Sequence, residues 1–300
     1  MNSDGDAVEE YIESRTELSS QPIDYSIRNR FIKVGVFVDL ANISRGGQKV
    51  RMDVLRRFAE MWGQVIRLNA YLSYDAERAE EDFEYRERAL NYQEMLRGFG
   101  FHTIVKEVKW YYDPETNRRV GKANVDVEMA VDLVLQAGNL DIVLLLTGDG
   151  DFVRAVQALR NTGRRVILVG FDNVSRALRE EVDAFTSGYI IPDLVPATWR
   201  SGGGPAWGDV GSTVRGVCYW HHSEESYGYL SYLREMSTEM WLFDPRHKDS
   251  PFEAAFFHDS ALPPEINPRN LPSRRYIFEF EIAKNERGIY ATNIRLISRL

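Results

Sequence analysis

The chain has 300 residues, of which 44% are hydrophobic and 27% are charged, and its formal net charge is −8. These values are ordinary for a folded globular protein and exclude a low-complexity or collagen-like chain. The single cysteine, Cys218, excludes a disulfide framework and favours a reducing compartment. No apolar run reaches the roughly 20 residues of a membrane-spanning helix, and the first residues lack a signal-peptide pattern. We therefore expect a cytoplasmic protein with no membrane partner.

The negative charge is concentrated in residues 1–29, which hold seven acidic and two basic side chains. Few apolar residues accompany them, and this composition predicts an acidic, flexible segment. Residues 30–211 and 212–300 are close to neutral, with net charges of −2 and −1. The overall charge therefore does not exclude a protein that acts on single-stranded nucleic acid.

From residue 31 onwards, predicted strands alternate with predicted helices. The strands are expected at 31–40, 65–74, 101–108, 141–147 and 166–170, and the helices at 53–61, 76–97, 122–136, 152–160 and 175–185. Strands that are separated by helices predict a parallel, layered α/β sheet.

Acidic residues follow two of the apolar strands. Asp39 ends the first strand with Asn42 just beyond it, and the strand that begins near Ile142 runs into Asp149 and Asp151. In open parallel sheets, ligands lie beyond the carboxyl ends of the strands. Crowded carboxylates are costly unless a cation joins them, and a hard divalent ion such as Mg²⁺ is suited to carboxylate oxygens.

A fourth carboxylate comes from the helix predicted after Lys122. Asp126 lies in its first turn, on the stripe that also carries Met129 and Leu133 and should face the sheet. Asp132 is rotated about a third of a turn away and is a weaker candidate. We expect four side chains to converge at one edge of the sheet: Asp39, Asp126, Asp149 and Asp151.

Three separated phrases, VFVDLAN, KANVDVEMAVD and LLLTGDGDFVRAVQALRNTGRRVILVG, resemble the NYN domain, a branch of the PIN-like metal-dependent ribonucleases. The resemblance extends from about Phe31 to Val195 and implies a Rossmann-like sheet with a Mg²⁺ or Mn²⁺ site. It assigns the metal to Asp39, Asp126, Asp149 and Asp151, with Asn42 as a polar neighbour. Ala123-Asn124 departs from the family, in which glycine is more frequent before the Val-Asp pair.

Basic and aromatic residues near these motifs have two interpretations. Arg45, Lys49, Arg118, Arg119 and Lys122 either hold a phosphate backbone near the metal or are solvated loop charges. The aromatic cluster 110–112, beside Lys106 and Lys109, either stacks on bases or closes an edge of the core.

Residues 197–211 are rich in glycine, serine and proline, and we interpret them as a linker between domains 30–196 and 212–300. After the linker, five short aromatic-rich segments are expected to be strands, a number that suits a small barrel. Their ranges are 214–220, 227–233, 254–258, 275–282 and 290–297.

The phrases GVCYWHHSEESYGYL, AFFHDSAL and YIFEFEIAKNERGIYATNIRLI in this part resemble a cold-shock domain, an OB-type barrel that binds single-stranded nucleic acid. By position, the resemblance implies a stacking role for Trp220, Tyr227, Tyr229, Phe256 and His258. Four positions depart from the family pattern and remove positive charge or aromatic rings from this surface: Tyr219, His221, Glu225 and Asp259. An alternative is a barrel that contacts protein or the catalytic domain.

Together these features predict a ribonuclease that hydrolyses single-stranded RNA with Mg²⁺ or Mn²⁺ and captures the strand on its barrel. The main alternative is a catalytically weak or inactive regulator that binds RNA or protein with the same two folds. Single-stranded DNA as substrate, and assembly as a homo-oligomer or with a protein partner, remain open at this stage.

Overall fold

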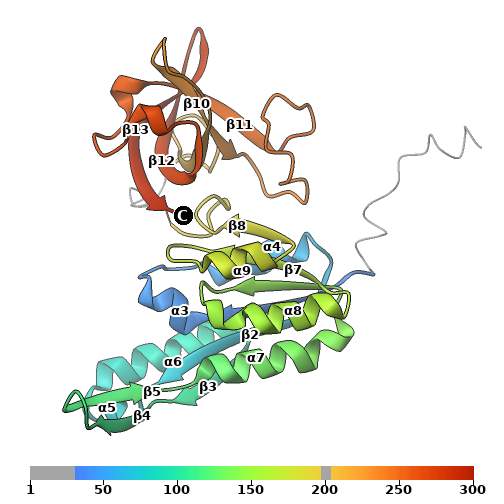
Figure 1. Ribbon diagram of the computed structural model, residues 1–300, viewed down its shortest axis with the longest axis vertical. Helices are drawn as coiled ribbons and strands as arrows, with labels where there is room; N and C mark the ends of the chain where they lie inside the picture. The colour runs from blue at the N-terminus through green and yellow to red at the C-terminus, as the bar shows by residue number, and fades with distance from the viewer. Residues whose placement is uncertain (1–30, 197–203) are drawn as a thin grey trace, which may run out of the picture.

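The computed structural model describes residues 31–196 and 204–300. The predicted acidic segment 1–29 and residues 197–203 of the predicted linker lie outside these ranges. Figure 1 shows a layered α/β body with a small barrel beside it, which confirms the predicted fold class. None of the helices within the two described ranges is long and apolar enough to cross a bilayer.

Six strands form the central sheet in the order β3–β2–β1–β6–β7–β8, and all neighbouring pairs are parallel. The chain builds outward from β1 through β2 to β3, then returns to the other side of β1 and builds through β6 and β7 to β8. The order therefore reverses between β1 and β6. The strands are β1 (Lys33–Asp39), β2 (Gln64–Tyr74), β3 (His102–Glu107), β6 (Ile142–Leu146), β7 (Arg165–Gly170) and β8 (Ala184–Ser187).

Strand β1 shows why both faces of the sheet are buried. Val34, Val36 and Val38 point into the core on one face, and Phe37 points into the core on the other. Side chains alternate between the faces along a strand, so a nearly continuous apolar sequence supplies both cores.

Helices cover the two faces separately. Phe58 of α4 (Met52–Glu60) and Leu96 of α6 (Phe83–Gly98) are buried in the first core. The second core contains side chains of α7 (Val125–Gln136), α8 (Val153–Asn161) and α9 (Arg176–Glu181). Short α3 (Leu40–Arg45) follows β1 directly.

The single helix predicted over 76–97 is two helices. Helix α5 (Ala76–Glu81) ends before Asp82, which has an extended backbone and accepts a hydrogen bond from the Tyr85 amide at 2.8 Å. This side-chain cap satisfies an amide that has no partner within α6. The break therefore has a local cause.

The helix predicted from residue 122 begins only at Val125. Before it, β4 (Lys109–Asp113) and β5 (Arg118–Lys122) form an antiparallel hairpin that the helix prediction missed. Asn124, between hairpin and helix, has a left-handed backbone with φ 45°. The helix predicted over 175–185 also ends earlier, at Glu181, and residues 184–187 form β8 because they pair with β7.

The C-terminal part is a closed barrel with strand order β10–β11–β13–β12–β9. All five predicted strands are present, each somewhat longer or equal in extent. They are β9 (Thr213–His222), β10 (Tyr227–Leu233), β11 (Phe252–His258), β12 (Ser273–Asn285) and β13 (Gly288–Arg299). A closed five-stranded barrel is consistent with an OB-like domain.

Part of the predicted linker packs against the barrel. Trp207 is buried, and its indole nitrogen donates a hydrogen bond to the Leu233 carbonyl at 2.7 Å. The Gly211 amide donates to the Ile282 carbonyl at 2.7 Å. Residues 207–211 are therefore fixed to the barrel, while the domain boundaries as a whole remain a prediction.

The barrel and the α/β body share a packed core. Leu233, Phe252 and Ile277 of the barrel belong to the same buried cluster as β1 and α4. At this junction Arg215 is almost fully buried, pairs with buried Glu279 at 2.8 Å and donates to the carbonyls of Val195 and Pro196. The Arg215 guanidinium thus links strands β9 and β12 of the barrel to the last described residues of the α/β body.

Replacing Arg215 is expected to destabilise the protein strongly. Arg215→Met leaves Glu279 buried with one cation fewer, and we expect a loss of about 3–5 kcal/mol in the free energy of unfolding. Urea denaturation measures this change. Arg246→Met, which removes the solvent-exposed pair with Asp244, is the matched control and should change stability little. Similar midpoints for both variants would show that the buried pair does not hold the junction.

Candidate active site at the carboxyl edge of the sheet

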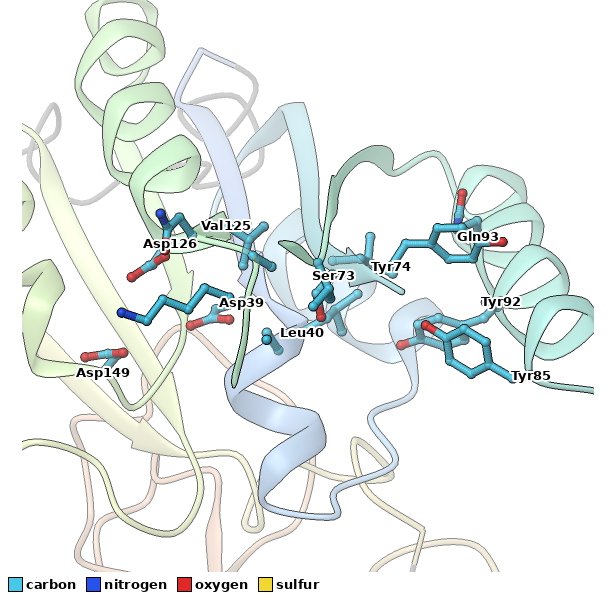
Figure 2. A pocket seen from close by; sticks show the side chains of 18 residues that line it. Asp39, Leu40, Ser73, Tyr74, Tyr85, Tyr92, Gln93, Val125, Asp126 and Asp149 are labelled. Atoms are coloured by element: carbon cyan, nitrogen blue, oxygen red, sulfur yellow. The ribbon is translucent and has the colours of Figure 1, made fainter. Parts of the chain in front are cut away.

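Three of the predicted carboxylates line one cavity of about 690 Å³: Asp39, Asp126 and Asp149. Asp39 ends β1 and Asp149 follows β6, the two strands between which the strand order reverses. Asp126 comes from the first turn of α7. Figure 2 shows the three side chains around the same open space. The reversal point of a doubly wound sheet is where ligands of such folds bind.

Asp39 is only 4% exposed, and hydrogen bonds hold it in place. Its carboxylate accepts from the Asn42 amide at 2.9 Å and from the Thr147 hydroxyl at 3.0 Å. A buried carboxylate needs such partners to offset the loss of water. These bonds also tie the end of β1 to the end of β6.

The loop around Asp149 is packed tightly. Asp149 caps the short helix that starts at Gly150, because its carboxylate accepts from the Asp151 amide at 3.0 Å. A Cβ atom at Gly150 would lie 2.8 Å from the Ser175 hydroxyl, and one at Gly148 would lie 3.2 Å from the Asn42 side-chain oxygen. Larger residues at these two positions would displace the loop that presents Asp149.

The Asp126 carboxylate forms no hydrogen bond or ion pair with any residue in the described ranges. It lies at the N-terminus of a 12-residue helix, where the helix dipole favours a negative charge. The side chain is therefore available for a ligand in the cavity.

The other acidic candidates lie elsewhere. Asp151 is exposed and does not line the cavity, although it stands two residues from Asp149. Asp132 accepts a hydrogen bond from the Tyr71 hydroxyl at 2.9 Å, and burial together with this carboxylate raises the pKa of Tyr71. Asp132 does not line the cavity, as expected from its rotation away from Asp126 on the helix.

Asn42 supports the loop rather than lining the cavity. Its side-chain oxygen accepts from the Gly148 amide at 2.9 Å, while its own backbone amide donates to Asp39. Asn42 therefore fixes the segment that carries Asp149 relative to the end of β1.

The donor set fits a hard divalent cation. Three carboxylates supply six oxygens, the ligand type that Mg²⁺ and Mn²⁺ prefer. In residues 31–196 and 204–300, however, no three acidic, histidine or cysteine side chains lie close enough to hold one ion together. The carboxylates line the cavity without converging on one point. Their ligand type and their place at the sheet edge suit a divalent cation, but their spacing does not form a complete binding group.

The predicted phosphate-binding residues are spread over several elements. Lys122 of β5 lines the cavity with the aspartates. Arg119 pairs with Glu77 and lies over the Trp110 ring at 5.0 Å, so it stabilises the hairpin. Arg118 and Lys49 are exposed, and the side chain of Arg45 is outside the described part of the structure.

On the barrel, four of the five predicted stacking residues form one aromatic cluster. Trp220 lies 5.4 Å from Tyr227 and 5.8 Å from Tyr229, and Phe256 lies 5.6 Å from Tyr227, between ring centroids. His258 is exposed and bonds to Ser260 at 2.9 Å instead of joining the rings. We call Trp220, Tyr227, Tyr229 and Phe256 the aromatic platform.

Sequence reasoning missed residues at both sites. His222 stacks on Tyr227 at 5.7 Å with an interplanar angle of 4°, and its spacing of two from Trp220 on a strand was the available signal. Four residues of the acidic cavity were also missed: Tyr74, Tyr85, Tyr92 and Gln93. The last three share one face of α6, a pattern that the sequence alone did not connect to the aspartates.

A cavity lined by carboxylates at the reversal point of a parallel sheet defines an α/β protein with an acidic ligand site. The NYN domain family model matches residues 33–192, and the chain belongs to this family, which is part of the PIN-like nuclease superfamily.

The chain is also similar to the low amplitude and bright protein LabA of Synechococcus elongatus. The two chains are 30% identical over 111 residues, which are 36% of this chain and 60% of LabA. This chain therefore matches less than two thirds of that relative. A solved structure of a protein of unknown function from Vibrio parahaemolyticus has 22% identity and a TM-score of 0.45, over 56% of this chain and 98% of that one.

Removing the Asn42 side chain is expected to loosen the Asp149 loop. Asn42→Ala leaves the Gly148 amide without its partner, which should cost about 1–3 kcal/mol of unfolding free energy. Urea denaturation and hydrogen exchange at Gly148 measure the effect. Asn91→Ala, on the exposed side of α6, is the control. Unchanged protection of the Gly148 amide would contradict the supporting role of Asn42.

Proposed function

We propose that this protein is a metal-dependent ribonuclease that hydrolyses phosphodiester bonds in single-stranded RNA. The observation that carries the proposal is the cavity shared by Asp39, Asp126 and Asp149 in an NYN domain. The single cysteine supports a cytoplasmic location.

The proposed metal ligands are the four aspartates at this edge: Asp39, Asp126, Asp149 and Asp151. Bound Mg²⁺ or Mn²⁺ would supply activation of water and stabilisation of the leaving oxygen. No side-chain nucleophile is required by this scheme. Asp151 is exposed and lies two residues from Asp149, and in this proposal it joins the ligand set from that position.

The chain's own residues position the substrate and the acids. Lys122 lines the cavity and offers its ammonium group to a phosphate. Asn42 and Thr147 hold Asp39 and the Gly148 amide in register. In this scheme Arg118, Arg119, Lys49 and Arg45 attract the strand at longer range.

The aromatic platform is proposed to capture the strand. Trp220 and Phe256 are 36% and 37% exposed, so their rings can stack on unpaired bases. His258, at the end of β11, would contact the backbone or a base at the border of the platform.

A second candidate function is an RNA- or protein-binding regulator with weak or no catalysis. The observation that favours it is the absence, within the described ranges, of three acidic side chains close enough to hold one ion. RNA cleavage and RNA binding by the pure protein separate the two candidates, and matched DNA oligomers test whether the 2′-hydroxyl matters.

Cleavage of an end-labelled single-stranded RNA is expected with Mn²⁺ or Mg²⁺ and should stop in EDTA. The Asp126→Asn/Asp149→Asn variant should lose at least 100-fold in rate, on the order expected when metal-ion stabilisation of the reaction is removed. Asp141→Asn, away from the cavity, is the control. Full activity of the double variant would remove this cavity from consideration, and binding without cleavage would favour the regulator.

Trp220→Ala is expected to weaken RNA binding while the catalytic rate at saturation changes little. Loss of one stacking ring should raise KM roughly tenfold. The matched control is Trp241→Ala, a 66% exposed indole outside the platform. A point variant is preferable to deletion of 212–300, because the barrel shares its core with the α/β body. A lower kcat with constant KM would assign the platform a structural role.

A further inference from the structure

The acidic cavity is larger than a hydrated metal ion requires. A divalent ion with six waters occupies roughly 200 Å³ at about 30 Å³ per water. The cavity measures about 690 Å³. Most of its volume is therefore available to another group, and a volume of this size suits a small organic ligand.

The end of the cavity away from the aspartates is formed by α6 and the end of β2. Tyr85, Ala89, Tyr92 and Gln93 line it at helix spacings of four, seven and eight, which place them on one face of α6. Figure 2 shows Tyr85, Tyr92 and Gln93 across the cavity from Asp126 and Asp149, with Ser73 and Tyr74 between them. We call Ser73, Tyr74, Tyr85, Tyr92 and Gln93 the tyrosine wall.

Part of this wall is rigid. The Tyr85 ring stacks on Tyr74 at 6.0 Å and 20°, and the guanidinium of Arg78 covers it at 4.5 Å. The Tyr85 hydroxyl accepts the Asp75 amide at 3.0 Å. Tyr85 is thus held from several sides and forms a fixed surface.

Two polar groups on the α6 side of the wall have no partner within the described ranges. The Tyr92 hydroxyl forms no hydrogen bond, and its side chain is 36% exposed. Gln93 is only 9% exposed, and its oxygen accepts from Arg97 at 3.3 Å, but its amide nitrogen donates to no described residue. Gln93 lines the cavity and its amide nitrogen is not fully buried, so this unpaired donor can reach a polar ligand there.

The two ends of the cavity differ in charge. The metal end carries three aspartates, whereas the tyrosine wall contains only neutral side chains. Lys122 and Asn124, from the segment before α7, line the same cavity. These two ends suit a ligand that has a phosphate for the acidic end, through a cation and Lys122, and a neutral flat ring with polar edges for the tyrosine wall.

We propose that the tyrosine wall binds the base of the nucleotide next to the phosphate that is cut. The base, splayed out of the strand, packs against the ring of Tyr92 and accepts a hydrogen bond from the Gln93 amide. This inference rests on the proposed function, because it takes the metal end as the place of the scissile phosphate. The wall is separate from the aromatic platform of the barrel.

The test combines Tyr92→Ala with RNA oligomers that each carry one abasic ribose near a mapped cleavage site. For the wild type, we expect one abasic position to lower kcat/KM roughly tenfold, as loss of one stacked base does. Tyr92→Ala should show a similar loss on intact RNA and no further loss at that abasic position. Such non-additivity identifies two groups that contact each other.

Controls separate contact from folding. Leu90 lies on α6 and is 48% exposed, so Leu90→Ala should behave as the wild type. Tyr92→Phe should retain part of the wild-type sensitivity of kcat/KM to the abasic ribose, because the substitution retains the ring. Positions read by the barrel should stay sensitive in the Tyr92 variant. The base-binding role is overturned if the fold-losses in kcat/KM caused by Tyr92→Ala and by the abasic ribose multiply at every position.

The same oligomers distinguish this failure from failure of the proposed function. If the wild type cuts no RNA with either metal, the oligomers are used for binding by fluorescence anisotropy. Non-additive losses of affinity at one abasic position would then support the tyrosine wall as a base site in a non-cleaving protein. RNA affinity that Tyr92→Ala leaves unchanged at all positions would overturn it.

Discussion

Three carboxylates that line one cavity at the sheet edge impose the constraint on which the site depends. Asp39, Asp126 and Asp149 would raise one another's electrostatic energy without compensation. The fold lowers this cost by hydrogen bonds to Asp39, a helix N-terminus at Asp126 and a capping role for Asp149. The cation proposed for this site would offset the remaining cost.

The packing around the site follows from this constraint. Asn42 connects the end of β1 to the Gly148 amide, and glycine at 148 and 150 lets the loop approach Asn42 and Ser175. Behind the loop, Gln48 and Tyr189 donate to Asp172, which also accepts from Ser298 of the barrel. A continuous set of polar contacts thus joins the chain after α3 to the last barrel strand.

The structure pairs two residues at which the barrel sequence departs from the cold-shock pattern that it resembles. His221 and Asp259 stand where the cold-shock pattern has aromatic residues, and their side chains form a hydrogen bond at 2.8 Å. The His221 ring also stacks on Phe257. The His221 side chain is therefore buried against the barrel core, while the aromatic platform lies on the outside.

The sequence by itself determined five of the six strands of the central sheet, the five barrel segments and the identity of the acidic candidates, because hydrophobic alternation and strand-end acids are local signals. Local patterns did not reveal the β4–β5 hairpin, the separation of Asp151 from the cavity or the partner of His221. Those features depend on contacts between residues far apart in the chain. Only the tertiary structure brought α6 opposite β1 and α7, and so placed Tyr92 and Gln93 in the cavity of Asp39.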